Sequence, residues 1–261
     1  KEGIATVAAR IAKLINRREA NGQKTVLSLA SGRSMRDLFV ELVRLHKEEG
    51  LSFKNVVVFG AYEFYPLSDS SLGSMAQIQS QLLEHIDILP ENVHTFPGDL
   101  PKETIFSFCE EYEKTIAEAG GIDIQVLGIG QCGNIAMNEP GTQQNSSTRL
   151  VIMDGNSRVD AKSLFGNVAQ VPTCAITLGI DTILKAKEVI LLAFGQHKAG
   201  IVKQAIEEVA SASCPASYLQ LHKNAFVVLD LDAANQLTRI NHPWKVTNCE
   251  WTDQLVRRAV V

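Results

Sequence analysis

Short apolar runs, each ending in a turn of small or polar residues, constrain the fold of this chain most strongly. The clearest runs are residues 25–29, 55–59, 122–127, 188–194 and 225–231. Stretches with apolar residues at helical spacing separate them, as in residues 2–20, where Ile4, Val7, Ile11 and Leu14 recur every three or four positions. Strands that alternate with helices predict an α/β fold with a doubly wound, mainly parallel, Rossmann-like sheet.

The remaining pattern predicts one domain followed by a short extension. We expect helices near residues 35–50, 75–83, 103–119 and 199–209, short strands near 93, 149–153 and 172–178, and an irregular or partly helical lid over 154–169. We assign residues 1–236 to the domain and residues 237–261 to a C-terminal extension. Because the chain starts at Lys1 and ends in an uncapped amphipathic segment, we expect both ends to be trimmed from something longer.

Composition excludes several classes of protein. The net charge of −4 and the lack of a basic run do not indicate a positively charged surface that could bind nucleic acid. No apolar stretch approaches the roughly 18 residues of a membrane span, and the amino terminus lacks the features of a signal peptide. The five cysteines are scattered, odd in number and never in a CxxC pair, which disfavours a disulfide framework or zinc cluster and favours a reducing, cytoplasmic setting.

The stretch Leu127–Thr142, LGIGQCGNIAMNEPGT, is the turn with the richest chemistry. It follows an apolar run and contains four glycines, one thiol, two asparagines and one carboxylate: Gly128, Gly130, Gly133, Gly141, Cys132, Asn134, Asn138 and Glu139. Glycines let a ligand approach the backbone closely, and open α/β sheets bind ligands at the carboxyl ends of parallel strands. The stretch therefore predicts a pocket but does not by itself indicate a reaction.

A second turn, SGRS at residues 31–34, lies between the first strand and its helix. Small hydroxyls, a glycine and an arginine at a helix N-terminus combine free N–H groups, the helix dipole and a cation, which suits a phosphate. The alternative is that Ser31 or Ser34 merely caps the helix, as such residues do in most proteins. The turn is not a Walker A loop, because GxxxxGK[ST] is absent.

Taken together, these strand ends and their flanking segments resemble the glucosamine-6-phosphate deaminase/isomerase family, whose fold includes the 6-phosphogluconolactonases. The similar segments are SFKNVVVF, EHIDILPENVHTF, GGIDIQVLGIG, NEPGT, QVPTCAITLGIDTILKAKEVILLAFGQHKA and SYLQLHKNAFVVLD, in family order over roughly residues 20–235. The motif NEPG at residues 138–141 resembles the corresponding motif of the deaminase branch of the family. The resemblance implies a deaminase/isomerase-type α/β fold and a role in amino-sugar phosphate metabolism.

The resemblance also implies a phosphate subsite. In the family, the phosphate of an amino-sugar phosphate lies on the first glycine turn, which here is Ser31, Gly32, Arg33 and Ser34. The lysine that ends a GxxK turn at the start of a helix, here Lys198, pairs with the phosphate. A further cation in the lid region aligns approximately with Lys162. Charge-assisted hydrogen bonds and a helix dipole suit a dianion, so this half of the pocket is expected to bind phosphate.

The catalytic half departs from the family. The family has an Asp-Glu-Tyr run, whose Asp moves a proton in the aldose–ketose step. This chain has YEF at that place, with Tyr62 instead of the Asp. The family's Asp-Gly-His, whose histidine opens the sugar ring, reads CGN here, with Cys132 and Asn134 in those places; Glu139 matches. Asparagine cannot titrate and tyrosine has a reference pKa of about 10. Each lost acid or base typically costs on the order of 10²–10⁴ in rate.

Other residues are weak substitutes. Glu63 is a candidate base, but neighbouring strand-end side chains point to opposite faces. Cys132 is a candidate nucleophile, but no histidine lies near it in sequence, and a thiol without an activating cation reacts poorly. His197 is expected either to contact the ligand or to face solvent.

We therefore expect a deaminase/isomerase-like protein that binds a sugar phosphate and whose deaminase activity is weak or lost. The alternative is a non-catalytic sensor or regulatory domain. A 6-phosphogluconolactonase is disfavoured, because its histidine would be Asn134. We expect no cofactor, no metal, no nucleic acid and no membrane as partners, and the sequence is compatible with a homo-oligomer. The C-terminal region resembles the junction in longer bacterial proteins where such a domain precedes a deacetylase-like domain.

Overall fold

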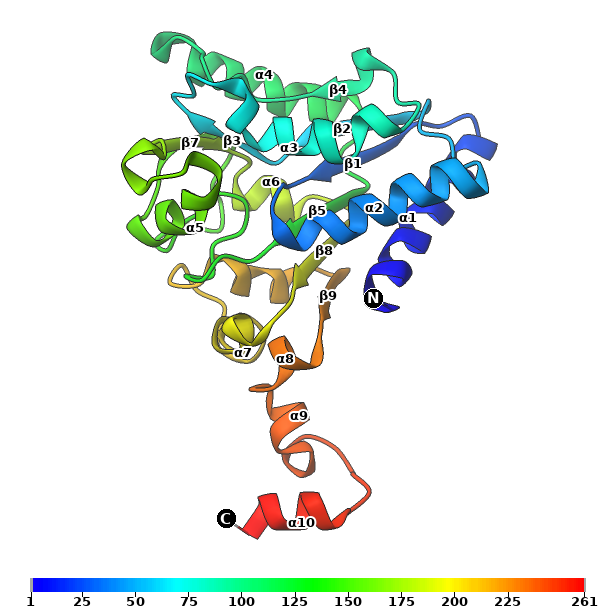
Figure 1. Ribbon diagram of the computed structural model, residues 1–261, viewed down its shortest axis with the longest axis vertical. Helices are drawn as coiled ribbons and strands as arrows, with labels where there is room; N and C mark the ends of the chain where they lie inside the picture. The colour runs from blue at the N-terminus through cyan, green and yellow to red at the C-terminus, as the bar shows by residue number, and fades with distance from the viewer. Residues whose placement is uncertain (1, 261) are drawn as a thin grey trace.

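A six-stranded parallel sheet forms the centre of the computed structural model, which describes residues 2–260 (Figure 1). Its strands lie in the order β4-β2-β1-β5-β8-β9. They are β1 (Thr25–Leu29), β2 (Val56–Gly60), β4 (Val93–His94), β5 (Ile124–Gly128), β8 (Glu188–Ala193) and β9 (Ala225–Leu229). The predicted doubly wound sheet is confirmed.

The strand order places a topological switch between β1 and β5. From β1 the chain builds outward through β2 and β4, and from β5 it builds outward the other way through β8 and β9. Leu27 pairs with Val58 on one side and with Ile124 on the other. Because the connections on either side of a switch point diverge, a crevice opens there at the carboxyl ends of the strands.

Helices cover both faces of this sheet. Helices α1 (Glu2–Ala20), α2 (Arg33–Glu49) and α3 (Ser74–Gln81) pack on one face. On the other face lie α4 (Ile105–Glu118), α6 (Ile180–Leu184) and α7 (Ala199–Glu207). The central strands are buried on both faces, which is why their sequences are continuous apolar runs.

A second, antiparallel sheet was not predicted. Strand β3 (Tyr62–Tyr65) pairs with β7 (Cys174–Thr177), which pairs with β6 (Arg149–Ile152). We expected residues 149–153 and 172–178 as strands but read YEFY as part of a turn. Helix α5 (Gly155–Phe165), in the segment expected to be a lid, packs against this sheet through Phe165, whose ring meets Phe64 edge-on at 5.1 Å.

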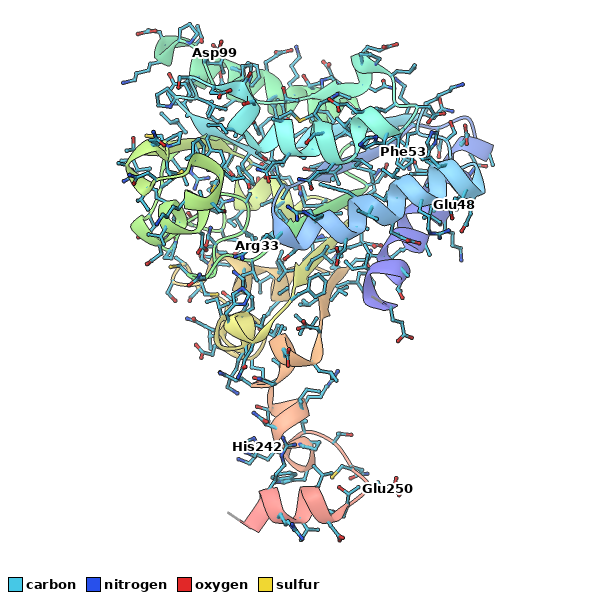
Figure 2. The ribbon with its side chains drawn as sticks, viewed as in Figure 1. Arg33, Glu48, Phe53, Asp99, His242 and Glu250 are labelled. Carbon is cyan, nitrogen blue, oxygen red and sulfur yellow. The ribbon has the colours of Figure 1, made fainter. Side chains whose placement is uncertain are left out.

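The C-terminal segment extends away from the domain (Figures 1 and 2). It contains α9 (Thr238–Asn241) and α10 (Asp253–Val260), whereas α8 (Leu231–Ala234) still belongs to the domain, where Ala233 and Ala234 are buried. The rings of Trp244 and Trp251 stack with their centroids 5.6 Å apart, so the segment is held partly by its own contacts. None of the helices among residues 2–260 is long and apolar enough to cross a membrane.

Candidate functional site

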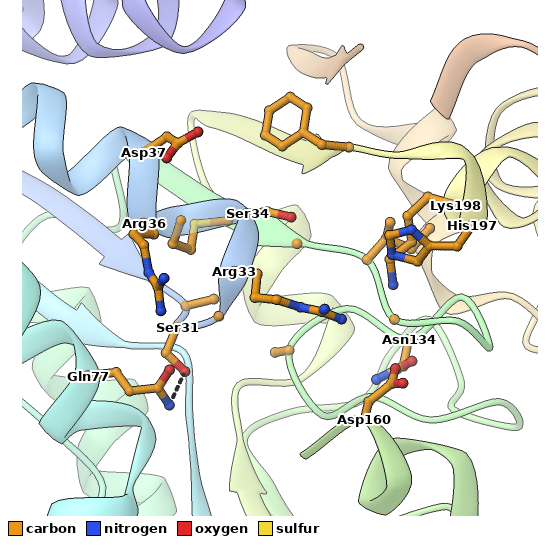
Figure 3. A pocket seen from close by; sticks show the side chains of 18 of the residues that line it. Ser31, Arg33, Ser34, Arg36, Asp37, Gln77, Asn134, Asp160, His197 and Lys198 are labelled. Atoms are coloured by element: carbon orange, nitrogen blue, oxygen red, sulfur yellow. Dashed lines mark hydrogen bonds between the residues drawn. The ribbon is translucent and has the colours of Figure 1, made fainter. Parts of the chain in front are cut away.

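A cleft of about 1370 Å³ opens at the carboxyl ends of β1, β5, β8 and β9, at the switch point between β1 and β5 (Figure 3). The turn after β1 forms one wall, and the glycine-rich loop after β5 faces it. Helix α5 contributes Asp160 and Ser163 from a third side, and the β8–α7 connection contributes His197 and Lys198. The cleft therefore lies where the sequence predicted a pocket.

The turn after β1 presents the open N-terminus of α2 to the cleft. Gly32 precedes the helix with φ 118°, a backbone conformation that favours glycine, and makes no side-chain cap. The first turn of the helix carries no acidic residue. The first N–H groups of α2 therefore keep their capacity to bind an anion.

Ser31 does not cap this helix. Its hydroxyl lies 2.9 Å from the hydroxyl of Tyr62, and it accepts a long hydrogen bond of 3.4 Å from the Gln77 amide. Tyr62 is half-buried and lines the cleft, and burial raises the pKa of its phenol. A neutral phenol held by a serine can donate a hydrogen bond to a ligand, but it is a poor base at neutral pH.

Three cations line the cleft without an ion-pair partner among the described residues: Arg33 and Arg36 at the start of α2, and Lys198, of which Arg33 and Lys198 act on one another. Burial lowers the pKa of Lys198, the positive charge of Arg33 lowers it further, and the negative charge of Asp160 opposes both effects. In Figure 3 the Arg33 side chain extends into the cleft toward the side where Lys198, Asn134 and Asp160 lie. An anionic ligand would relieve the repulsion between Arg33 and Lys198.

Asn134 is the buried polar group of the glycine-rich loop that faces the cleft. Its side chain is 8% exposed, and its amide has no hydrogen-bond partner among the described residues. A Cβ on Gly130 would lie 1.8 Å from the Asn134 Oδ1 atom, so a larger residue there would push the amide out of its present position. An amide that faces the cleft and has no protein partner can hydrogen-bond to a ligand there, which makes Asn134 a candidate ligand contact.

Three other residues predicted for the site point elsewhere. Glu63 is buried and accepts hydrogen bonds from the backbone N–H groups of Phe64, Ser74 and Met75, at 2.8, 2.7 and 2.9 Å. Burial raises the pKa of Glu63, and these three bonds oppose that effect. Its carboxylate thus caps α3 and does not line the cleft.

Glu139 and Cys132 contact the start of α5. Glu139 accepts hydrogen bonds from the Ser157 hydroxyl at 2.9 Å and the Asp154 N–H at 3.2 Å. Burial raises the pKa of Glu139, and the Ser157 bond opposes it. Cys132 Sγ lies 3.4 Å from the Asn156 amide. Both side chains join the loop to the lid helix, and neither lines the cleft.

Lys162 also lies outside the cleft, on the exposed side of α5. In its place α5 presents Asp160, which accepts a hydrogen bond of 2.7 Å from the Gln131 amide. Sequence reasoning missed Asp160, Gln77 and Arg36 as lining residues. The helical spacing of residues 160–164 could have indicated which side chains share a face, but only with the packing face known.

The geometry supports binding of an anion beside polar groups. No cluster of three metal-ligating side chains occurs within residues 2–260. The titratable groups of the inner cleft include Tyr62, Asp160, His197 and Lys198, and a histidine is absent from the glycine-rich loop.

Comparison with known proteins places this site in a family. The sequence profile of the glucosamine-6-phosphate isomerases/6-phosphogluconolactonases matches residues 1–228. A glucosamine-6-phosphate deaminase of Shewanella woodyi is 40% identical over 235 residues, which are 90% of this chain and 88% of that protein. A glucosamine-6-phosphate deaminase-like protein of Bacteroides thetaiotaomicron is 48% identical over the whole chain, which spans 40% of that protein's length.

Solved structures of a deaminase and of a 6-phosphogluconolactonase have the same fold as this chain. A monomeric glucosamine-6-phosphate deaminase superimposes with a TM-score of 0.83 at 33% identity, over 89% of this chain and 95% of that one. The 6-phosphogluconolactonase of Thermotoga maritima, at 21% identity and a TM-score of 0.68, shares the fold over 88% of this chain and 95% of that one. On the profile match and these relatives, the chain belongs to the glucosamine-6-phosphate isomerase/6-phosphogluconolactonase family.

Proposed function

We propose that this chain binds an amino-sugar phosphate in the cleft, with glucosamine-6-phosphate deaminase activity that is weak or lost. The observation that carries the proposal is the contrast between the two halves of the cleft. The phosphate half has Arg33, Lys198 and the uncapped N-terminus of α2. The other half has Tyr62 and Asn134 where the family places an acid or base.

The phosphate would lie between the turn at residues 31–34 and Lys198. Charge-assisted hydrogen bonds from two cations and from helix N–H groups favour a dianion over a neutral sugar. The sugar would then extend toward Tyr62 and Asn134, whose phenol and amide can hydrogen-bond to its hydroxyl groups. Neither group provides a proton acceptor that titrates near neutral pH, so ring opening and proton transfer would be slow.

Calorimetric titration with glucosamine 6-phosphate tests the binding half of this proposal. Arg33→Ala and Lys198→Ala should each weaken binding about tenfold or more, since each removes a charged hydrogen-bond donor. Lys162→Ala is the matched control, because it removes a lysine of α5 that lies outside the cleft. Equal losses in all three variants would contradict the assigned phosphate subsite, and no binding by the natural chain would contradict the proposal.

Assays of ammonia and fructose 6-phosphate release test the catalytic half. The triple variant Tyr62→Asp/Cys132→Asp/Asn134→His restores the family's residues, and its turnover should exceed that of the natural chain by at least about 10²-fold. Adding Glu139→Gln to the triple variant should reduce the restored turnover. Turnover of the natural chain at ordinary enzyme rates would refute the proposed loss of activity.

A non-catalytic sensor or regulatory domain is the second candidate function. The unpartnered Asn134 amide and the free cations favour binding whether or not a reaction follows. A sensor would bind glucosamine 6-phosphate and release no ammonia even when the restored variant does. All five cysteines are free within the described residues, which supports a reducing, cytoplasmic setting for either function.

We also propose that residues 237–261 lead into a further domain of a longer protein. The segment extends from the domain body (Figure 2), and it carries the exposed side chains of Val246, Trp251 and Val256. The Bacteroides relative aligns across this segment and is longer than the chain. If the segment is a connector, removing residues 237–261 should leave sugar-phosphate affinity unchanged; a large loss of affinity would instead make it part of the binding domain.

A further inference from the structure

The cleft has a second cationic region that the phosphate subsite does not use. Arg36 lines the cleft one turn after Arg33 on α2. Residues three apart on a helix are neighbours, with Cβ atoms about 5–6 Å apart. Figure 3 nevertheless shows the two side chains diverging: Arg33 extends toward the glycine-rich loop, and Arg36 toward Ser31 and Gln77.

This pair of arginines is unfavourable for the helix by itself. Cations at a helix N-terminus oppose the dipole, and like charges on neighbouring turns repel. The first turn of α2 holds no acidic residue to offset them. Arg36 forms no ion pair within residues 2–260. Asp37, the adjacent acid that lines the cleft, is directed away from the Arg36 guanidinium in Figure 3.

Polar groups surround the Arg36 region. The Gln77 amide donates only long hydrogen bonds, of 3.4 Å to the Ser31 hydroxyl and 3.4 Å to the Gly73 carbonyl. Gln81, one turn further along α3, also lines the cleft. The donors that converge here are a guanidinium, a primary amide and, through Ser31, the phenol of Tyr62.

The size of the cleft also exceeds what one sugar phosphate needs. Its volume of about 1370 Å³ is above the range of about 300–1,000 Å³ typical for a pocket that encloses a small ligand. Two cationic regions on either side of the α2 N-terminus, within one cleft, match a ligand that is negatively charged at both ends.

We propose that the cleft takes a hexose phosphate with a second anionic group, which binds at Arg36 and Gln77 while the first phosphate lies at Arg33 and Lys198. This inference rests on the proposed phosphate subsite and specifies the class of ligand. The sugar spans the two regions along the turn at residues 31–34, beside Tyr62. A guanidinium suits a phosphate or carboxylate at this end, because its planar donors match either group.

Calorimetric titration with glucosamine 6-phosphate and with glucosamine 1,6-bisphosphate tests the inference. The bisphosphate should bind at least about tenfold more tightly than the monophosphate, as expected for one added charge-assisted contact. Arg36→Ala should remove most of this ratio, and Arg36→Lys should keep part of it. Lys47→Ala, which removes an exposed cation from the far end of the same helix, should leave the ratio unchanged.

The outcomes separate this inference from the proposed function. Monophosphate binding with no gain for the bisphosphate would overturn the second region alone. An equal loss of both affinities in Arg36→Ala would also overturn it, since Arg36 would then belong to the first phosphate subsite. Failure of both ligands to bind would overturn the proposed function and this inference together.

Discussion

Replacing Glu63 by alanine should lower the free energy of unfolding by about 3–5 kcal/mol. The sequence made this residue a candidate base, whereas in the structure its carboxylate holds three backbone N–H groups of Phe64, Ser74 and Met75. Two of these N–H groups begin α3. The carboxylate also packs closely against Gly73, where a Cβ would lie 2.8 Å from Oε2.

The magnitude follows from the groups left without partners. A buried N–H that loses its acceptor costs about 1–3 kcal/mol, and alanine leaves three of them. Against this, the buried carboxylate itself is partly desolvated, as the raised pKa of Glu63 indicates, and removing it returns some of that cost. Because Glu63 is only 3% exposed, bulk water does not reach the three N–H groups that alanine would leave without an acceptor.

Urea denaturation of the natural chain, Glu63→Ala, Glu63→Gln and Glu84→Ala measures this. Glutamine retains one acceptor oxygen, so Glu63→Gln should lower the free energy of unfolding by only about 1–2 kcal/mol, and Glu84→Ala, which removes an exposed glutamate that follows α3, should change it by close to zero. A change below about 1 kcal/mol in Glu63→Ala would refute the capping role. Loss of the turnover of the restored triple variant on adding Glu63→Gln, at unchanged stability, would indicate a catalytic base instead.

Three further predictions concern Gly130, Gly179 and Glu139. Gly130→Ala should weaken sugar-phosphate binding about tenfold in calorimetry with little change in Tm, because its Cβ would lie 1.8 Å from the Asn134 Oδ1 atom and would push the amide aside. Unchanged affinity would contradict a role for Asn134 in the site. Gly179→Ala should destabilise the chain by about 1–3 kcal/mol in urea, because its Cβ would lie 2.0 Å from the fixed Ser146 carbonyl oxygen. The raised pKa of Glu139 means that the folded chain holds this proton at a higher pH than the unfolded chain does, so this group's contribution to stability falls as pH rises from 4.5 to the raised value. Glu139→Gln should flatten that part of the urea-midpoint profile, and an unchanged slope would contradict the shift.

The parallel sheet was predictable because strands that are buried on both faces have continuous apolar sequences. The runs VVVF in β2 and VILLA in β8 are apolar along their whole length, and both strands are buried throughout. The cleft was predictable for a related reason, since parallel strands bring their carboxyl ends to one edge of the sheet.

The antiparallel sheet was not predictable in the same way. Strand β3 holds Glu63 at its centre, and a buried carboxylate hides the apolar pattern of YEFY. Its partner β7 lies more than 100 residues further along the chain, so no hairpin turn announces the pairing. Tyr62 and Glu63 point to opposite faces of β3, which is why one lines the cleft and the other caps α3.

The lid cation illustrates the limit set by helix geometry. Successive residues on an α-helix are separated by about 100°. Asp160 and Lys162 therefore lie on different faces of α5, although only one residue separates them in sequence. Without the packing of Phe165 against the antiparallel sheet, the sequence cannot indicate which of the two faces the cleft.

Several contacts that hold the glycine-rich loop do not depend on the residues at positions 132 and 134. Gly133 has φ 80°, and a Cβ there would lie 2.6 Å from Cys214 Sγ, so packing as well as backbone requires glycine. The Asn138 amide donates to the Leu178 carbonyl at 2.8 Å and fixes the exit of the loop. None of these contacts uses a side chain at position 132 or 134. Substitutions at those two positions can therefore remove acid–base chemistry while the loop keeps its shape, and for the same reason the restored residues should fold into the same cleft.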